Sequence, residues 1–214
     1  MKIRYWTGIA LIAAYFCATQ GFASGTAADQ RSQADQRPDQ SKTHPLAALR
    51  KQKPLYDERH PPHAGDEGVF FGPFVKLIDG DTFFARIQGV VMEFRLSDID
   101  APEHDQPYGV RSRDELRSLI GGHQLIIVFV DTDRYGRTVS QVWVNNMNVN
   151  HEMARRGAAW FYPQFARDDA VFEIEQQARD AKRGLWGLSS DERIEPWIWR
   201  ERKRQAAAVR SSAF

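Results

Sequence analysis

Five short segments rich in β-branched and aromatic residues lie in the middle of this 214-residue chain, and turn residues bound most of them. They are residues 68–78, 82–88, 90–96, 124–130 and 138–144. Runs of this length and composition are typical of β-strands, and the first three follow one another closely enough for an antiparallel meander. Asp79-Gly80 and Gly89 supply the turns of that meander, and Gly72-Pro73 predicts an interruption in its first strand.

Three further segments have the features of α-helices. Residues 109–120 carry apolar side chains at helical spacing and end at Gly121-Gly122. Helices are also expected near 150–156 and over 168–183, where acidic residues come early and basic residues late, as the helix dipole favours. The predicted fold class is therefore mainly β with α (α+β), a small five-stranded closed barrel with about three packed helices.

The first 23 residues resemble a secretory signal. Basic residues precede an apolar run at 9–18, and Gly21-Phe22-Ala23 offers small residues at a cleavage point. The apolar run is shorter than the about 20 residues that span a membrane, so we favour export, secreted or periplasmic, over an uncleaved anchor. Cys17, the only cysteine, lies in this segment, and the exported chain would therefore contain no disulfide and no cysteine-based site.

Composition divides the rest of the chain into three parts. Residues 24–65 are rich in Gln, Asp, Arg and Pro with few aromatics, so we expect a disordered linker there and a folded domain over 66–187. In the tail, residues 188–214, Trp197 and Trp199 are followed by four basic residues. Such a tail could contact nucleic acid, or it could dock its tryptophans on its own domain, which we favour as the simpler reading.

Net charge bears on the class of function. The whole chain has a formal net charge of +1, and removal of the first 23 residues, which hold two basic and no acidic residues, makes it −1. A tight non-catalytic binder that neutralises many phosphates would carry a large basic excess, whereas an enzyme that releases its product needs only local positive charge. The near-neutral net charge therefore favours an enzyme over a tight, non-catalytic binder.

Acidic and basic residues recur at four places where predicted strands begin or end. They are Asp79-Gly80-Asp81-Thr82, then Arg95, then Asp100-Ala101-Pro102-Glu103, and finally Asp133-Arg134-Tyr135-Gly136-Arg137. Taken singly, each is explained by a turn, a loop entry or a surface charge. Closure of the strands into a barrel would bring them to one end, where carboxylates and guanidinium groups together suit metal-assisted phosphodiester hydrolysis.

The acidic members of this set suit a hard cation. Asp81 and Asp100 offer carboxylate oxygens, and the Ala101 carbonyl could add a ligand. Ca²⁺ prefers such oxygen ligands, and the scarcity of His and absence of Cys nearby argue against zinc.

The remaining members suit the chemistry at a phosphate. Glu103 follows Pro102, which fixes the local backbone, and could orient the attacking water or accept its proton. Arg95 and Arg137 could bind phosphoryl oxygens whose negative charge grows during displacement.

At this point the chain resembles a known family, the staphylococcal-type thermonucleases, which are Ca²⁺-dependent secreted nucleases on an OB-fold barrel. The resemblance covers roughly residues 70–187 and rests on motifs in the expected order. They are Ile78-Asp79-Gly80-Asp81-Thr82, Phe94-Arg95-Leu96, Asp98-Ile99-Asp100-Ala101-Pro102-Glu103, Asp133-Arg134-Tyr135-Gly136-Arg137, Val149-Asn150 and Gly184-Leu185-Trp186. The resemblance implies side-chain Ca²⁺ ligands at Asp81 and Asp100 with a backbone ligand at Ala101. It implies catalytic residues at the following positions: Arg95, Glu103 and Arg137.

The resemblance also implies the reaction and the substrate contacts. Enzymes of this family cleave DNA and RNA on the 5′ side of the phosphodiester and leave 3′-phosphate ends. Arg134 is expected to contact a terminal phosphate, Tyr135 to stack on a base or sugar, and Tyr162 to lie near the tyrosines that hold a nucleotide in the family. The best-known members have Thr where this chain has Ala101, which is harmless if only the carbonyl binds metal.

Two other classes of function compete with the nuclease. A catalytically silent OB-fold module could bind nucleic acid without cleaving it, although such a module would be expected to lack at least one catalytic residue, and all are present here. A structural or envelope-attachment protein would explain the two ends of the chain but not its central motifs. We expect DNA and RNA as substrates, no protein partner, no stable membrane span after signal cleavage, and a monomer.

Overall fold

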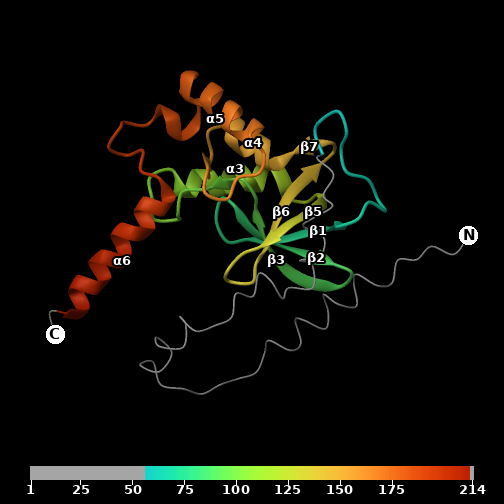
Figure 1. The fold of residues 1–214 in the computed structure, drawn as a ribbon, viewed down its shortest axis with the longest axis horizontal. Helices are drawn as coiled ribbons and strands as arrows, with labels where there is room; N and C mark the ends of the chain where they lie inside the picture. The colour runs from blue at the N-terminus through green and yellow to red at the C-terminus, as the bar shows by residue number, and fades with distance from the viewer. Residues whose placement is uncertain (1–55, 213–214) are drawn as a thin grey trace, which may run out of the picture.

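The computed structural model of this protein describes residues 56–212, shown in colour in Figure 1. The predicted signal, residues 1–23, and the predicted linker up to residue 55 lie outside the described residues. Within the described part, no helix is both long enough and apolar enough to cross a membrane.

A closed β-barrel forms the centre of the structure (Figure 1). Its strands are β1 (Val69–Leu77), β2 (Thr82–Ile87), β3 (Val90–Leu96), β5 (Gln124–Thr132) and β6 (Thr138–Val144). Neighbours pair in the order β3-β2-β1-β5-β6, all antiparallel, and parallel pairing of β3 with β6 closes the ring. The predicted α+β fold with a five-stranded OB-fold-like barrel is confirmed.

Strand β1 belongs to both sides of the barrel. Residues 69–73 pair with β5, and from Phe74 onward the strand pairs with β2, with a register shift between Phe74 and Lys76. The sequence predicted an interruption at Gly72-Pro73; the structure has one continuous strand that changes partner there. The change suits proline, because Pro73 has no N–H to donate to a continuing ladder.

Short strands extend this arrangement. Strand β7 (Met147–Asn148) pairs with β6 at the edge of the barrel sheet. A separate two-stranded sheet joins β4 (Ile99–Asp100) to β8 (Trp160–Phe161), with Asp100 opposite Trp160. Sequence reasoning predicted none of these three strands, since two-residue strands have no periodicity to detect.

The helices lie to one side of the barrel, and the last of them extends away from it (Figure 1). They are α3 (Gly109–Ile120), α4 (Val149–Arg155), α5 (Ala170–Asp180) and α6 (Pro196–Ser212), with a 3₁₀ turn, η3 (Gly184–Gly187). The helices predicted at 109–120, 150–156 and 168–183 correspond to α3, α4 and a shorter α5. Helix α6 lies in the predicted tail, where no helix was expected, although Pro196 occupies the first helical position that proline favours.

The main core joins the barrel interior to α3 and α4. Phe83 and Phe94 face each other from β2 and β3 with ring centres 5.6 Å apart, and both are buried. Leu116 of α3 and Met153 of α4 are fully buried in the same cluster. Inward and outward side chains alternate along the strands, and the inward ones fill the barrel. This alternation is the pattern by which the sequence predicts the strands.

Trp160, Leu185 and Trp186 form a second, smaller core with Ala178 of α5. Gly184, which leads into η3, has φ +56°, and a Cβ atom there would lie 2.4 Å from the Arg156 carbonyl oxygen. Glycine is therefore required for the chain to return against the second core, as the Gly184-Leu185-Trp186 motif indicated.

Packing against the barrel begins early in the described chain. Tyr56 is buried with Val128 and Trp143, and its hydroxyl donates a hydrogen bond to Asp66 Oδ2 at 2.9 Å. Residues from 56 onward thus contact the barrel, although the sequence placed them in the linker 24–65.

Candidate active site

Two buried aspartates meet at one end of the barrel through a shared arginine. Arg95, at the end of β3, places Nη1 2.9 Å from Asp81 Oδ1 and Nη2 2.7 Å from Asp100 Oδ1. Asp81 comes from the turn between β1 and β2, and Asp100 from β4. The fold therefore brings three of the predicted site residues into direct contact.

The β1–β2 turn is held rigidly against α3. Asp79 Oδ1 accepts a hydrogen bond from the Asp81 N–H at 3.0 Å. A Cβ atom on Gly80 would lie 1.9 Å from Ser112 Oγ and 2.8 Å from the Ala101 Cβ, so no larger residue fits without movement of its neighbours. The glycine of this motif thus allows the turn to pack directly on the helix and on the loop that carries Ala101.

Asp81 is further fixed by two donors. Thr82 Oγ1 donates to Asp81 Oδ1 at 2.8 Å, and the Ala101 N–H donates to Asp81 Oδ2 at 2.9 Å. Burial alone would raise the pKa of the Asp81 carboxyl, but the charge of Arg95 and these hydrogen bonds outweigh burial and lower it. Asp81 is therefore held as a carboxylate.

Asp79 has the opposite shift. Burial, and next the negative charge of Asp81, raise the pKa of Asp79 to about 7. Burial is the main cause and the charge of Asp81 the second, and a cation bound beside these acids would favour the ionised form of Asp79.

Glu103 lies in a short loop that is closed by hydrogen bonds between Glu103 and Gln106. The Glu103 N–H donates to Gln106 Oε1 at 3.1 Å, and the Glu103 carbonyl accepts from the Gln106 N–H at 2.9 Å. A Cβ atom on Gly109, at the start of α3, would lie 1.8 Å from the Glu103 carbonyl oxygen. The side chain of Glu103 remains one-third exposed (33%), and its backbone is fixed.

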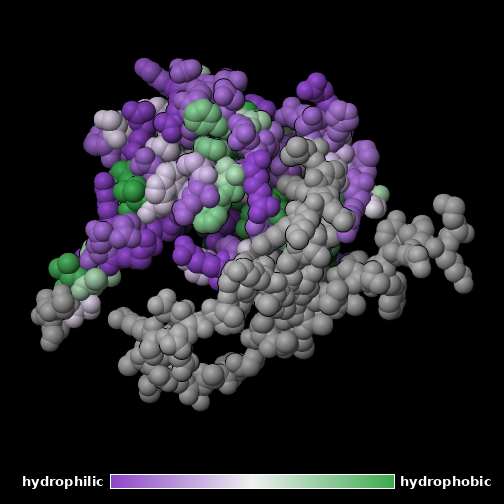
Figure 2. All heavy atoms as spheres, in the orientation of Figure 1, coloured by the Kyte–Doolittle hydropathy of each residue, from purple (hydrophilic) through white to green (hydrophobic). Residues whose placement is uncertain are grey.

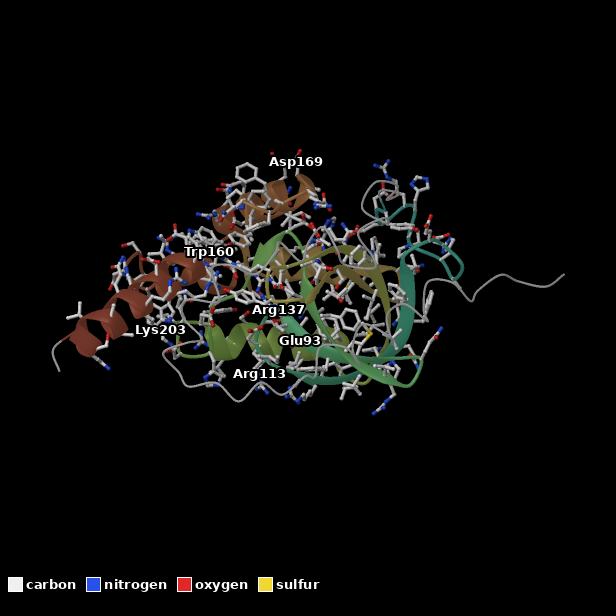
Figure 3. All side chains as sticks on the ribbon, turned by 60° about the horizontal axis from the view of Figure 1, so that its bottom comes forward. Glu93, Arg113, Arg137, Trp160, Asp169 and Lys203 are labelled. Carbon is white, nitrogen blue, oxygen red and sulfur yellow. The ribbon has the colours of Figure 1, made fainter. Side chains whose placement is uncertain are left out.

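Arg137 begins β6 after the hairpin that follows β5. Asp133 holds it through Nε at 2.7 Å and through its backbone N–H at 3.0 Å. Its positive charge also contributes to the lowered pKa of Asp81, which places it at the same end of the barrel. Figure 3 shows Arg137 on the barrel and Lys203 on α6, which extends away from it.

The predicted substrate-binding residues fall in two places. Tyr135 is 72% exposed at the hairpin tip, and the guanidinium carbons of Arg134 and Arg137 lie 5.4 and 5.5 Å from its ring centre. Tyr162 instead stacks on Trp197 of α6, with ring centres 5.3 Å apart and planes at 13°. The tail tryptophan therefore docks on its own domain, the alternative that the sequence favoured.

Sequence reasoning missed one residue of this site, Arg200. This α6 side chain places Nη2 2.6 Å from Asp100 Oδ2 and Nη1 2.9 Å from Glu103 Oε1. The signal was the Trp197-Ile198-Trp199-Arg200 run after Pro196, which resembles an amphipathic helix start that could dock beside the loop.

The donor set fits a hard cation by chemistry. Asp81, Asp100 and the Ala101 carbonyl supply only oxygen. Among residues 56–212, no group of three or more His, Cys, Asp or Glu side chains is arranged as a ready metal cage. A cation held here would therefore need water or substrate oxygens to complete its shell.

Known proteins are similar to this chain in sequence. The family model described as staphylococcal nuclease homologue matches residues 93–188. A protein of Escherichia coli O157:H7 named "Uncharacterized endonuclease" is 42% identical over 133 residues, which are 62% of this chain and 86% of that protein. The chain belongs to the staphylococcal nuclease homologue family. The predicted family is confirmed.

Other members of the staphylococcal nuclease homologue family are similar over comparable lengths. The micrococcal nuclease of Shigella flexneri is 34% identical over 148 residues, 64% of this chain and 84% of that protein. A probable staphylococcal-like nuclease of Oryza sativa subsp. japonica is 35% identical over 114 residues, 53% of this chain and 34% of that protein. The matched family range includes Arg95, Asp100, Glu103 and Arg137, whereas Arg200 lies beyond it.

Proposed function

We propose that this protein is a Ca²⁺-dependent nuclease that hydrolyses phosphodiester bonds of DNA and RNA and leaves 3′-phosphate ends. The observation that carries the proposal is the ion-paired unit of Asp81, Arg95 and Asp100 at one end of the barrel, with Glu103 and Arg137 beside it. Membership of a nuclease family supports the reaction class.

Nucleic acid is the proposed substrate because the exposed groups near the site match its chemistry. Tyr135 offers an exposed aromatic face to a base or sugar, and Arg134 and Arg137 flank that face with positive charge. The specific product, a 3′-phosphate, rests on the family resemblance.

Asp81, Asp100 and the Ala101 carbonyl are the residues that would hold Ca²⁺. When bound there, the cation would neutralise charge on the phosphate that is being attacked. Asp81 is suited to this role because Arg95 and the Ala101 N–H keep it ionised and in place.

Side chains of the protein perform the remaining steps of phosphodiester hydrolysis. Glu103, on its fixed loop, orients the attacking water and accepts its proton. Arg137 is 25% exposed and can turn from Asp133 to a phosphate oxygen, and Arg95, less exposed at 13%, adds positive charge from within the site. Each such contact strengthens as the phosphoryl group becomes more anionic.

Export is also proposed for this protein. The support is the sequence of the first 23 residues, in which basic residues precede an apolar run and small residues follow. A secreted or periplasmic nuclease would meet Ca²⁺ outside the cytoplasm.

The test is cleavage by the protein comprising residues 24–214 of single-stranded DNA and of RNA, with Ca²⁺ and with excess chelator. We expect degradation only with the cation, and fragments whose 3′ ends become extendable after phosphatase treatment. Glu103→Gln, which keeps the side-chain size, serves as the matched inactive control. Full cleavage in chelator would disprove the metal dependence, and cleavage by the control would remove Glu103 from the mechanism.

A silent nucleic-acid-binding module is the second candidate. One observation favours it: Arg200 pairs with Asp100, a proposed cation ligand, and with Glu103, the proposed base, and so occupies groups that a catalytic site would use. Retarded migration of single-stranded DNA with no cleavage at any Ca²⁺ concentration would select this alternative.

A further inference from the structure

The C-terminal helix inserts a third guanidinium into the candidate active site. Arg200 forms a forked contact with Asp100, with Nη2 at 2.6 Å from Oδ2 and Nη1 at 3.1 Å from Oδ1, and the same Nη1 also contacts Glu103 Oε1 at 2.9 Å. The residues it joins include a proposed cation ligand and the proposed base. A contact this specific, made across 100 residues of sequence, calls for a role at that site.

The start of α6 is docked on the domain by a few side chains. Trp197 stacks on Tyr162 and meets the edge of Trp160, with ring centres 6.3 Å apart. Trp199 Nε1 donates to Asp105 Oδ1 at 3.2 Å. After the first turns, α6 extends outward, and its side chains over 202–211 are exposed (Figure 1).

The outer part of α6 begins with hydrophilic residues, followed by apolar ones. Figure 2 shows hydrophilic side chains where the helix leaves the body of the protein, at lower left, and hydrophobic ones nearer its tip. Lys203 of this helix also forms an ion pair with Asp105 of the loop, at 2.6 Å. A helix docked through its first turns can shift without disturbing the barrel core.

The acceptor capacity of Asp100 is nearly used up. Its carboxylate is fully buried and accepts one hydrogen bond from Arg95 and two from Arg200. A carboxylate has about four lone-pair positions. Two of these hydrogen bonds go to Oδ1 and one to Oδ2, so the position that remains is on Oδ2, and a divalent cation bound there would lie directly beside the Arg200 guanidinium.

Of the two arginines, Arg200 is the one that can leave. The Arg95 side chain is 13% exposed and lies between Asp81 and Asp100, whereas the Arg200 side chain is 32% exposed on the docked helix. Movement into water costs Arg200 less than it would cost the more buried Arg95, and a divalent cation in the site would repel the Arg200 guanidinium. Arg200 and a bound cation therefore compete for Asp100.

We propose that Arg200 is a further active-site residue, a positioning residue that holds Asp100 and Glu103 in place without the cation and is displaced when Ca²⁺ binds. This inference rests on the proposed function, because it requires Ca²⁺ to bind at Asp100. Binding equilibria are reciprocal. Because Ca²⁺ displaces Arg200 from Asp100, the Arg200–Asp100 contact that helps to dock α6 in turn lowers the affinity of the site for Ca²⁺.

The first test measures Ca²⁺ affinity of the full chain by calorimetry, in wild type, Arg200→Gln and Arg204→Gln. The control, Arg204, lies on the same helix and pairs only within it, with Glu201. We expect Arg200→Gln to bind Ca²⁺ on the order of fivefold more tightly or better, Arg200→Lys to be intermediate, and the control to equal wild type. Unchanged or weaker binding by Arg200→Gln would overturn the inference.

The second test follows amide hydrogen exchange in residues 196–204 of the wild-type full chain. Ca²⁺ should raise exchange there and leave residues 109–120 of α3 unchanged, because Arg200 belongs to α6 and makes its ion pairs with Asp100 and Glu103, outside α3. Unchanged exchange in protein saturated with Ca²⁺ would also overturn the inference. If wild type neither binds Ca²⁺ nor cleaves DNA, the proposed function itself fails; if it does both without these effects, only the role of Arg200 fails.

Discussion

At the scale of single residues, the two predicted catalytic arginines occupy different surroundings. Arg95 lies between two buried carboxylates, and Arg137 is bound by one partly exposed aspartate at a hairpin. Removal of one charge from a buried ion pair lowers the free energy of unfolding more than removal from an exposed pair. Substitution of Arg95 should therefore reduce both stability and activity, and substitution of Arg137 mainly activity.

Arg137→Ala should keep the fold and lose activity. Truncation removes one surface ion pair, worth about 1 kcal/mol or less, but removes a contact to the developing phosphate charge, worth on the order of a hundredfold in turnover. Cleavage rates at saturating substrate and thermal melting check both parts. The control is Arg86→Ala, since the Arg86 side chain donates a hydrogen bond to the Gly89 carbonyl, in the turn between β2 and β3. Wild-type turnover in Arg137→Ala would show that this arginine does not bind the phosphate.

Arg95→Ala should instead reduce both stability and activity. Its loss leaves Asp81 with no ion pair and Asp100 with Arg200 alone, and removal of one partner of a buried ion pair costs about 3 kcal/mol or more. Urea unfolding followed by circular dichroism measures the change. A loss of stability similar to that of Arg137→Ala would contradict the buried position of Arg95.

At the scale of elements, helix α4 is secured to the surface by a small ion network. Glu152 accepts hydrogen bonds from Arg155 Nη1 at 2.5 Å and from Arg156 Nε at 2.9 Å, and Arg156 also reaches Glu115 of α3 at 2.8 Å. Burial raises the pKa of Glu152, but the hydrogen bonds from Arg156 and Arg155 outweigh burial and lower it below its usual 4.5. The network therefore connects two helices that cover the barrel.

Glu152→Gln should lower stability in a pH-dependent way. A carboxyl whose pKa is lower in the folded state stabilises the protein above its unfolded pKa, and this stability is lost as pH falls through the folded pKa. The variant should be about 1 kcal/mol less stable than wild type at pH 7, and the difference should shrink below about pH 4.5. Chemical unfolding at several pH values checks this, and an equal difference at pH 3 and pH 7 would exclude the ionic explanation.

At the scale of the whole molecule, the proposed cation site exists only when the barrel is closed. Asp81 and Asp100 come from different elements and meet through Arg95, so the unfolded chain offers no such pair. A ligand that binds only the folded state stabilises it in proportion to its binding.

Ca²⁺ should therefore raise the melting temperature of the protein. At a free concentration of about 100 times Kd, the expected stabilisation is about 2.7 kcal/mol. Asp81→Asn, which removes a ligand charge and keeps the shape, should abolish the shift, and Glu67→Gln, whose altered side chain lies before β1, should retain it. Thermal melting with and without the ion measures this, and a full shift in Asp81→Asn would exclude Asp81 as a ligand.

The sequence by itself determined the barrel strands, three helices and the family. Side-chain alternation and helical spacing are local patterns, and a motif such as Asp79-Gly80-Asp81-Thr82 can be read locally because a tight turn needs these residue types.

Only the tertiary structure decided how distant segments meet. It assigned Tyr162 to a stack with Trp197 rather than to the hairpin of Tyr135, and it brought Arg200 to Asp100. These contacts depend on where a docked helix places its side chains after the barrel has closed. No local periodicity encodes that position, because pairing between residues so far apart in the chain is fixed by packing and by the charges that packing brings together.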